Sequence, residues 1–299
     1  MILFLIVIAI LAAPFIIEWR RIPMDAQARA DAPGEFASLS NGITHYQFHG
    51  PVDGPLVVCV HGLTTPSFVY EGLAKRLVER GHRVLVYDHY GRGYSDRPKG
   101  DQDRAFFVSH LEELLEHLNI DTPFDLVGYS MGGWVVTAYA AIHPKMIKRL
   151  FLLAPAGMGH ELGWTAKLVR DVPIIGDWVF MATYAKQHRR GCEVERALDN
   201  TVPFVVDRQQ KELQYRGFIP SVLASLRGAL ANDTKEDHQR IAYHDLDVRA
   251  IWGADDVVIP LSAKDQLEVW NPKVRHHVIE GAGHGVTYTH TDAMMAAFD

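Results

Sequence analysis

A serine between two glycines follows a short apolar run at positions 126–134 (LVGYSMGGW). Gly128 and Gly132 each stand two positions from Ser130. Small residues at this spacing let a strand turn abruptly into a helix, which holds the serine in a strained backbone conformation with its hydroxyl exposed at the carboxyl edge of a sheet. A serine that only caps a helix is the alternative interpretation. Because an apolar strand precedes the turn and a helical pattern follows it, we expect Ser130 to be a nucleophile.

A serine hydroxyl is a poor nucleophile unless a base removes its proton, so a histidine is needed as well. Sixteen histidines are present. His284 lies in the segment 281–285 (GAGHG), directly after the last apolar strand pattern, on a loop at the carboxyl edge of the predicted sheet. We therefore expect His284 to be the general base. His110 and His117 are expected on the exposed face of a helix instead.

The histidine in turn needs a carboxylate that fixes its tautomer and stabilises the imidazolium ion. Asp255 and Asp256 both follow the apolar run 248–252, within the segment 253–260 (GADDVVIP). From position alone, either aspartate is a candidate for the third member of a catalytic triad.

A nucleophile at such a turn is served by two backbone N–H groups that stabilise the oxyanion. One comes from the residue after the nucleophile and the other from a loop after an earlier strand, which in this sequence are Met131 and Leu63. Gly62 permits the backbone turn that aims the Leu63 N–H inward. His61 is expected to brace this loop by hydrogen bonding and to take no part in the chemistry.

Short apolar runs alternate with helical patterns over most of the chain, which is typical of strand–helix–strand units. Right-handed crossovers would stack these units into one doubly wound, mostly parallel sheet, so the predicted fold class is α/β. Residues 42–48, with the turns at 50–54, are expected to form an antiparallel hairpin. The predicted strands cover residues 56–60, 83–87, 124–128, 149–154, 248–252 and 274–279. The predicted helices cover residues 68–80, 104–118, 132–143 and 262–270, with a closing helix from about residue 291.

The alternation stops between residues 157 and 244, where helices are expected over 165–172, 207–215 and 220–230 and no strand is predicted. We expect this insertion to form a lid over the carboxyl edge of the sheet. Its apolar residues are expected in part to form a wall for an acyl chain and in part only to pack the lid onto the sheet. These residues are Trp164, Val172, Ile174, Ile175, Trp178, Val179, Phe180 and Met181.

Residues 2–17 carry no charge, and the length of this run is near the lower limit of about 17–25 residues for a membrane span. A secretory signal normally begins with basic residues and ends in small residues, and this segment has neither. We therefore expect an uncleaved membrane anchor, with a cleaved signal and a secreted or periplasmic protein as the alternative. Because Arg20 and Arg21 lie on its C-terminal side, the positive-inside tendency places the body on the cytoplasmic side.

The predicted organisation is therefore an anchor (1–22), a linker that leads into the core (23–43), an α/β core in two pieces (44–156 and 245–299) and a helical lid (157–244). The 299 residues have a formal net charge of −6 and no long basic run, which argues against a nucleic-acid surface. Cys59 and Cys192 indicate neither a disulfide framework nor a metal site. No cofactor or metal is expected, because a serine triad needs neither. The sequence leaves the oligomeric state open.

The order of the serine, the aspartate and the histidine along the chain is that of the α/β-hydrolase superfamily, and the sequence resembles this superfamily from about residue 44 to its end. The resemblance implies that Asp256 is the acid, because it stands three positions after Gly253 and four before Pro260, and that Asp255 is its solvated neighbour. The motifs that carry it are residues 61–62 (HG), 88–96 (DHYGRGYSD), 128–132 (GYSMG), 253–256 (GADD) and 283–284 (GH).

Within the superfamily, the N-terminal apolar segment and residues 126–133 and 154–158 (APAGM) resemble membrane-anchored monoacylglycerol lipase-like hydrolases. The loop after His61 reads Gly-Leu-Thr-Thr-Pro and departs from the Gly-Gly-Pro-Gly of proline iminopeptidases. Haloalkane dehalogenases and epoxide hydrolases attack with a carboxylate where this chain has a serine. Carbon–carbon bond hydrolases share the serine triad, although many carry a tryptophan where this chain has Gly285.

We therefore expect a serine-dependent carboxylic ester hydrolase, esterase-like or lipase-like. Its substrate would be a small lipid-like acyl ester, such as a monoacylglycerol, drawn from the membrane or its interface. Two alternatives keep the same triad: carbon–carbon hydrolysis of a ring-fission-type diketone, and thioester hydrolysis. A non-catalytic, membrane-tethered binding module would be expected to lack a triad member, and the sequence lacks none.

Overall fold

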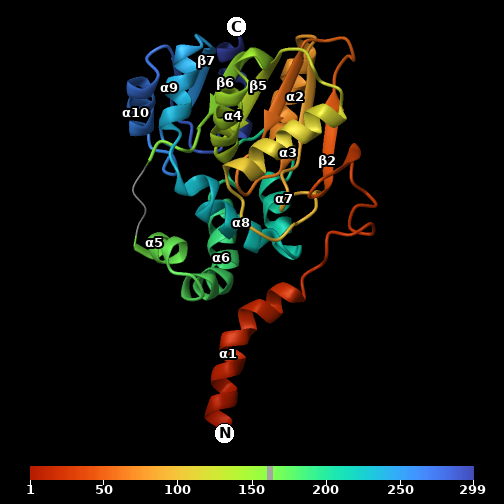
Figure 1. Cartoon of the computed structure of the whole chain (residues 1–299), viewed down its shortest axis with the longest axis vertical. Coiled ribbons are helices and arrows are strands. Elements are labelled where there is room, and N and C mark those ends of the chain that lie inside the picture. The colour runs from red at the N-terminus through yellow and green to blue at the C-terminus, as the bar shows by residue number, and fades with distance from the viewer. Residues whose placement is uncertain (160–163) are drawn as a thin grey trace.

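An eight-stranded sheet forms the centre of the computed structural model, which describes residues 1–159 and 164–299 (Figure 1). The strand order is β1-β2-β4-β3-β5-β6-β7-β8. β2 pairs antiparallel with β1 and with β4, and all other neighbours are parallel. The predicted doubly wound, mostly parallel α/β sheet is thus confirmed. The strands are β1 (Glu35–Leu39), β2 (Gly42–His49), β3 (Leu56–Val60), β4 (Arg83–Tyr87), β5 (Phe124–Tyr129), β6 (Ile147–Leu153), β7 (Asp247–Gly253) and β8 (Arg275–Ile279).

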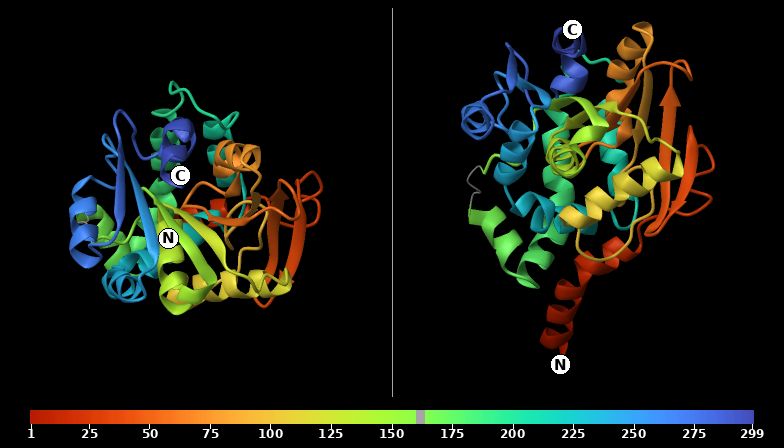
Figure 2. Two further views of the ribbon diagram at one scale, coloured as in Figure 1. Left: turned by 90° about the horizontal axis from the view of Figure 1, so that it is seen from above. Right: turned by 45° about the horizontal axis from the view of Figure 1, so that its top comes forward.

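Helices cover both faces of the sheet (Figure 2). In β3 the side chains of Val58 and Val60 belong to the core on one face, and those of Val57 and Cys59 to the core on the other. This is why the central strands are apolar without alternation. One face is covered by α3 (Arg104–His117), α4 (Met131–Ile142), α9 (Lys235–Tyr243) and α10 (Ser262–Trp270). The other is covered by α2 (Glu71–Glu79), α11 (Val286–Thr289) and α12 (Thr291–Met294).

Every regular element described between residues 157 and 244 is helical. Phe180, Leu213 and Phe218 belong to a small core shared by three of these helices, at residues 164–171, 175–193 and 218–227. In Figure 1 all of these helices except α9 lie toward the end of the sheet away from the C-terminus, and α9 lies beside α10. Besides α9 they are α5 (Trp164–Asp171), α6 (Ile175–Glu193), α7 (Val205–Lys211) and α8 (Phe218–Arg227).

Two of these helices, α6 and α9, were not predicted from the sequence. α6 packs against α1 (Ile2–Trp19) as well as against α5 and α8, so its apolar residues do not form the single stripe that marks an amphipathic helix. α9 is polar over most of its length, and Ile241 is its one apolar residue in the main core. α6 was therefore missed because it has neighbours on more than one side, and α9 was missed because it has no apolar stripe.

The N-terminal hairpin differs from the prediction in its partner strand. β2 covers the predicted residues 42–48, but its hairpin partner β1 lies upstream, and the turn falls at residues 40–41. His110 also corrects the prediction, because it is buried and not on an exposed face. Its Nε2 lies 2.8 Å from Thr44 Oγ1, and its ring stacks on Tyr90 at a centroid distance of 3.9 Å.

The apolar residues expected to form a wall for an acyl chain are not gathered in one place. Ile174 and Ile175 are 80% and 58% exposed, at the turn between α5 and α6. Phe180 is buried inside the small core of the inserted helices. Trp164 begins α5, and its side chain lies outside the described residues. The apolar residues of this segment therefore belong partly to a solvent-exposed turn and partly to the packing between helices.

α1 is the one helix, among the residues that the structure describes, that is long and apolar enough to cross a membrane, with a mean hydropathy of 2.6. It extends away from the rest of the molecule and contains Pro14 (Figure 1). A signal sequence near the N-terminus would meet the same criteria of length and hydropathy.

The close approach of α4 to β3 gives a test of the packing. A Cβ at Gly132 would lie 1.9 Å from the Val60 carbonyl oxygen, so Gly132→Ala should lower the free energy of unfolding by about 3 kcal/mol or more. Gly191 in α6 is the control, because a Cβ there meets nothing within 4 Å. Gly191→Ala should raise stability by about 0.5–1 kcal/mol. Denaturant unfolding measures both, and equal effects would contradict the packing argument.

Candidate active site

Ser130 lies at the turn between β5 and α4 with φ 54° and ψ −118°, a conformation that side chains rarely adopt. Its N–H donates to the Leu153 carbonyl at 2.9 Å, and its own carbonyl accepts from the Ala156 N–H at 3.0 Å. The backbone of β6 and of the loop after it therefore fixes the turn. The predicted strand-to-helix turn is present, and its strain is held by its surroundings.

His284 joins the other two predicted residues. Its Nε2 lies 3.0 Å from Ser130 Oγ, and its Nδ1 lies 2.8 Å from Asp256 Oδ2. A carboxylate can only accept, so Nδ1 carries the hydrogen and Nε2 presents its lone pair to the serine hydroxyl. Ser130 and the His284 side chain are both partly exposed, so a small molecule can reach them.

The two neighbouring aspartates differ in burial and in hydrogen bonding. Asp256 is buried, and its Oδ1 accepts from the N–H groups of Val258 and Ile259, both at 2.8 Å. Asp255 is exposed to solvent. The structure therefore brings Asp256, and not Asp255, within hydrogen-bond distance of the imidazole of His284.

The loop after β3 passes beside Ser130, since a Cβ at Gly62 would lie 3.2 Å from the Ser130 Cβ. His61 Nδ1 donates to the Gly62 carbonyl at 2.8 Å, and its Nε2 accepts from the His89 N–H at 2.9 Å. Burial lowers the pKa of His61 to about 4, so the ring is neutral and keeps this tautomer. Because the Gly62 carbonyl belongs to the peptide group that carries the Leu63 N–H, His61 fixes the direction of that N–H. This matches the bracing role expected for His61.

The two predicted oxyanion donors are available for a ligand. Neither the Leu63 N–H nor the Met131 N–H donates to another group in the described residues. The Met131 N–H is also at the N-terminus of α4, where the helix dipole favours negative charge.

Arg92 is a buried residue to which the sequence analysis assigned no role. Its Nε donates to the Leu63 carbonyl at 3.0 Å, and its guanidinium also bonds Gln102 Oε1 at 2.7 Å and Ser225 Oγ at 2.8 Å. Burial lowers the pKa of Arg92 to about 9. The side chain therefore ties the loop of the candidate oxyanion site to α8 of the inserted segment. The sequence feature that could have pointed to Arg92 is an arginine inside the glycine-containing segment 88–96, directly after a strand.

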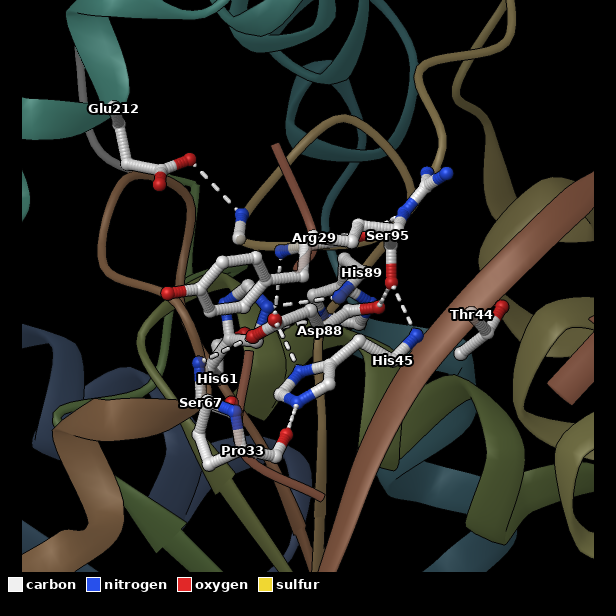
Figure 3. Close-up of polar contacts among 12 residues, drawn as sticks. Arg29, Pro33, Thr44, His45, His61, Ser67, Asp88, His89, Ser95 and Glu212 are labelled. Atoms are coloured by element: carbon white, nitrogen blue, oxygen red, sulfur yellow. Dashed lines mark hydrogen bonds and ion pairs between the residues drawn. The ribbon is translucent and has the colours of Figure 1, made fainter. Parts of the chain in front are cut away.

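Asp88, the first residue of the 88–96 loop, is the centre of a group of buried polar contacts (Figure 3). Its carboxylate accepts from the Ser67 N–H at 2.9 Å and from the Tyr94 N–H at 3.0 Å, and lies 2.7 Å from His45 Nδ1. Although burial opposes ionisation, His45 and the N–H donors hold the pKa of Asp88 below its usual range. This ionised carboxylate links β2, the short 3-10 helix at Ser67–Tyr70 that precedes α2, and the 88–96 loop.

Glu212 connects the inserted segment to that loop (Figure 3). Its carboxylate accepts from the Gly93 N–H at 2.9 Å and lies 3.3 Å from the Arg97 guanidinium. Burial raises the pKa of Glu212 to about 7, against the opposing effect of Arg97. The contact between the inserted segment and the core therefore contains a carboxyl group whose pKa is about 7.

A second polar group from the inserted segment lies near His284. Glu195 accepts from the Tyr288 hydroxyl at 2.6 Å, and Gln209 donates to Thr65 Oγ1 at 3.1 Å. Burial raises the pKa of Glu195, and His284 opposes this rise. No sequence motif marked these residues, because they approach one another only in the fold. In the described residues no cluster of three or more His, Cys, Asp or Glu side chains is arranged to hold a metal ion.

The two aspartates provide a matched test. Asp256→Asn should leave the fold intact and lower kcat by roughly 10⁴-fold, because an amide no longer selects the Nδ1–H tautomer of His284. Asp255→Asn should change kcat by less than about twofold, since Asp255 is exposed. Steady-state ester hydrolysis measures both. A larger loss of kcat in the Asp255 variant would mean that Asp255, and not Asp256, is the acid that assists His284.

Glu212 gives a test of pH dependence. Because its pKa in the folded chain is raised from 4.5 to about 7, the folded state loses stability as pH rises through this interval. Glu212→Gln removes the titration and keeps an acceptor for the Gly93 N–H. The difference in thermal midpoint between this variant and wild type should therefore be more favourable to the variant at about pH 8 than at about pH 5. Glu236→Gln, on the exposed surface of α9, is the control and should show no such difference. The opposite trend would mean that the effect of Arg97, which lowers the pKa of Glu212, is larger than the effect of burial, which raises it.

Comparison with known proteins agrees with this geometry. The profile of the alpha/beta hydrolase fold matches residues 55–291. A 2-hydroxymuconate semialdehyde hydrolase from Pseudomonas putida is 30% identical over 219 residues, which is 70% of this chain and 73% of that protein. An esterase from Exiguobacterium antarcticum superposes with a TM-score of 0.73 at 24% identity, over 89% of this chain and 97% of that one. A hydrolase from Pseudomonas aeruginosa gives a TM-score of 0.71 at 23% identity, over 90% and 99%. The chain therefore belongs to the α/β-hydrolase fold family.

Proposed function

We propose that the protein is a serine hydrolase that cleaves carboxylic esters through an acyl-enzyme. The observation that carries this proposal is the continuous path from Asp256 through His284 to the strained Ser130, with contacts of 2.8 and 3.0 Å. Three side chains from three separate loops meet in this order, and each has the donor or acceptor that the next one needs. Membership of the hydrolase fold family supports the same chemistry.

In the proposed reaction, Ser130 Oγ attacks the ester carbonyl carbon while its proton passes to His284 Nε2. The oxyanion accepts hydrogen bonds from the N–H groups of Leu63 and Met131. The bond to the alcohol oxygen then breaks, and His284 donates its proton to the leaving alcohol. Water next attacks the acyl carbon, with its proton taken by His284, and the acid leaves as Ser130 regains its hydrogen. Asp256 stays ionised throughout and stabilises the imidazolium.

A lipid-like ester is the substrate class that we propose, and a monoacylglycerol is one example. α1 supports it, because a chain held in a bilayer by this helix meets acyl esters at the membrane surface. Contacts of the end of α1 support an uncleaved anchor: Glu18 Oε1 accepts from the Gly217 N–H at 2.6 Å, and Ile22 pairs with Tyr215. Arg20 and Arg21 then favour a body on the cytoplasmic side. Residues 157–244 serve in this proposal as the lid.

Carbon–carbon bond hydrolysis is the second candidate, and the Pseudomonas putida relative favours it. Its name gives 2-hydroxymuconate semialdehyde as its substrate, a molecule with no ester group, so that the bond cleaved there joins two carbons. The same triad would serve such a substrate, since His284 can pass its proton to a carbon leaving group. Thioester hydrolysis needs no change in the residues at all.

Active-site labelling separates these reactions. A fluorophosphonate should label the wild-type chain and not Ser130→Ala, and the variant should lose roughly 10⁴-fold or more in kcat. Ser38→Ala, an exposed serine in β1, is the control and should label normally. A p-nitrophenyl ester series from acetate to palmitate should show turnover that peaks at medium or long chains. Labelling without ester turnover would favour carbon–carbon hydrolysis, and no labelling would refute Ser130 as the nucleophile.

A further inference from the structure

A groove of about 690 Å³ runs between α1 and α6. Ile10, Ala13 and Ile17 form its wall on α1, and Trp178 and Met181 form its wall on α6. This space is separate from the triad, none of whose residues lines it. Figure 1 shows α1 leaving the body on the side where α5 and α6 lie.

The two walls of the groove contact each other directly, and the chain just after α1 is hydrogen-bonded to the segment between α7 and α8. Near the middle of α1, the Trp178 Nε1–H donates to the Ile10 carbonyl at 3.4 Å. At its end, the Ile22 N–H donates to the Gln214 carbonyl at 3.0 Å, and the Arg216 N–H donates to the Ile22 carbonyl at 2.8 Å. The groove is therefore bounded by two elements that the fold keeps in contact.

The charges of the groove lie at the end near the body of the protein. Arg20, Lys186 and Arg189 line it and are exposed, and none of them has a carboxylate within salt-bridge distance in the described residues. Arg21 is different, because its Nε is 2.7 Å from Glu18 Oε2. Three uncompensated cations therefore stand at the end of an apolar channel. A phosphate group attached to an acyl chain complements both parts.

The length of the channel matches one leaflet of a bilayer. Ile10 and Arg20 are ten residues apart, which in a helix is about 15 Å, and the hydrocarbon of one leaflet is about 15 Å thick. The tip between α5 and α6 lies on the same side and exposes Val172, Ile174 and Ile175. Ile174 has a φ of 69°, which is rare for a β-branched residue and turns the chain sharply at this tip. With α1 in the membrane, the tip and the groove face the leaflet nearest to the body.

We propose that this groove binds one anionic phospholipid of that leaflet. Its acyl chain lies between Ile10–Ile17 and the side chains of Trp178 and Met181. Its phosphate is held by Arg20, Lys186 and Arg189. The site rests on the proposed membrane insertion of α1 and is independent of the bond that Ser130 cleaves. The bound lipid completes the contact between the anchor and the lid, and so sets the orientation of the lid at the membrane.

Lipid retention by the full chain tests the site. We would reconstitute the Ser130→Ala protein, which cannot hydrolyse the probe by the proposed mechanism, with equal amounts of phosphatidylglycerol and phosphatidylcholine. Native mass spectrometry after exchange into detergent would then count retained lipids. One phosphatidylglycerol should remain on the chain. The added changes Arg20→Gln, Lys186→Gln and Arg189→Gln should weaken retention by roughly 10- to 100-fold.

A matched variant controls for the loss of three charges. Lys75→Gln, Lys145→Gln and Lys148→Gln remove three exposed cations that do not line the groove, and this variant should retain phosphatidylglycerol like the parent. Equal retention of phosphatidylcholine, or an equal loss in both triple variants, would overturn the proposal. So would displacement of the lipid by millimolar inorganic phosphate, which would indicate a small-anion site.

Two further readouts keep this test apart from the proposals on which it depends. Resistance of the protein to carbonate extraction reports on α1, and its failure would remove the membrane insertion itself. Fluorophosphonate labelling of the groove variants with Ser130 restored reports on the triad and should be unchanged. Loss of lipid retention with both readouts intact therefore concerns the groove alone.

Discussion

The turn at Ser130 can form only because two positions lack a side chain. A Cβ at Gly128 would lie 2.4 Å from the Gly132 carbonyl, and one at Gly132 would lie 1.9 Å from the Val60 carbonyl. β3, β5 and the start of α4 thus meet at backbone distance, and this packing imposes the positive φ of Ser130. A strain of about 1–3 kcal/mol is usual for such a residue and has to be offset by the surrounding core. The loop after β3 then lies beside Ser130 as a consequence of the same contact.

A layer of buried polar side chains separates the sheet from the inserted helices and sets the loops between them. Its members include Asp88, Arg92 and Glu212, and the loss of a hydrogen bond to buried Asp88 or Arg92 would leave a charge without compensation. That cost selects one arrangement of the loops. Because Arg92 bonds both the Leu63 carbonyl and α8, the direction of a candidate oxyanion donor is coupled to the position of the inserted segment.

The sequence predicted the parts of the site that depend on local context. Ser130 and His284 each stand after an apolar strand among glycines, and the parallel sheet brings such positions to one edge. Asp255 and Asp256 are adjacent in the sequence, and only in the structure are they distinguished, because the N–H groups of Val258 and Ile259 hold the Asp256 carboxylate in place. Contacts between distant segments were beyond prediction: His110 is buried by a strand 66 residues away, and α6 has neighbours on more than one side. The fold was predictable because the central strands are apolar on both faces.

The pairing of Ile22 with Tyr215 leaves no slack between α1 and the inserted helices. A domain attached through a flexible linker samples a volume set by the length of the linker. With α1 held in a bilayer, this pairing would restrict the height and tilt of Ser130 above the membrane, while the chain could still rotate about the membrane normal and diffuse in the plane. For the proposed lipid substrate, encounter would then be a two-dimensional search, and its rate would follow the surface density of the substrate and not its concentration in bulk solution.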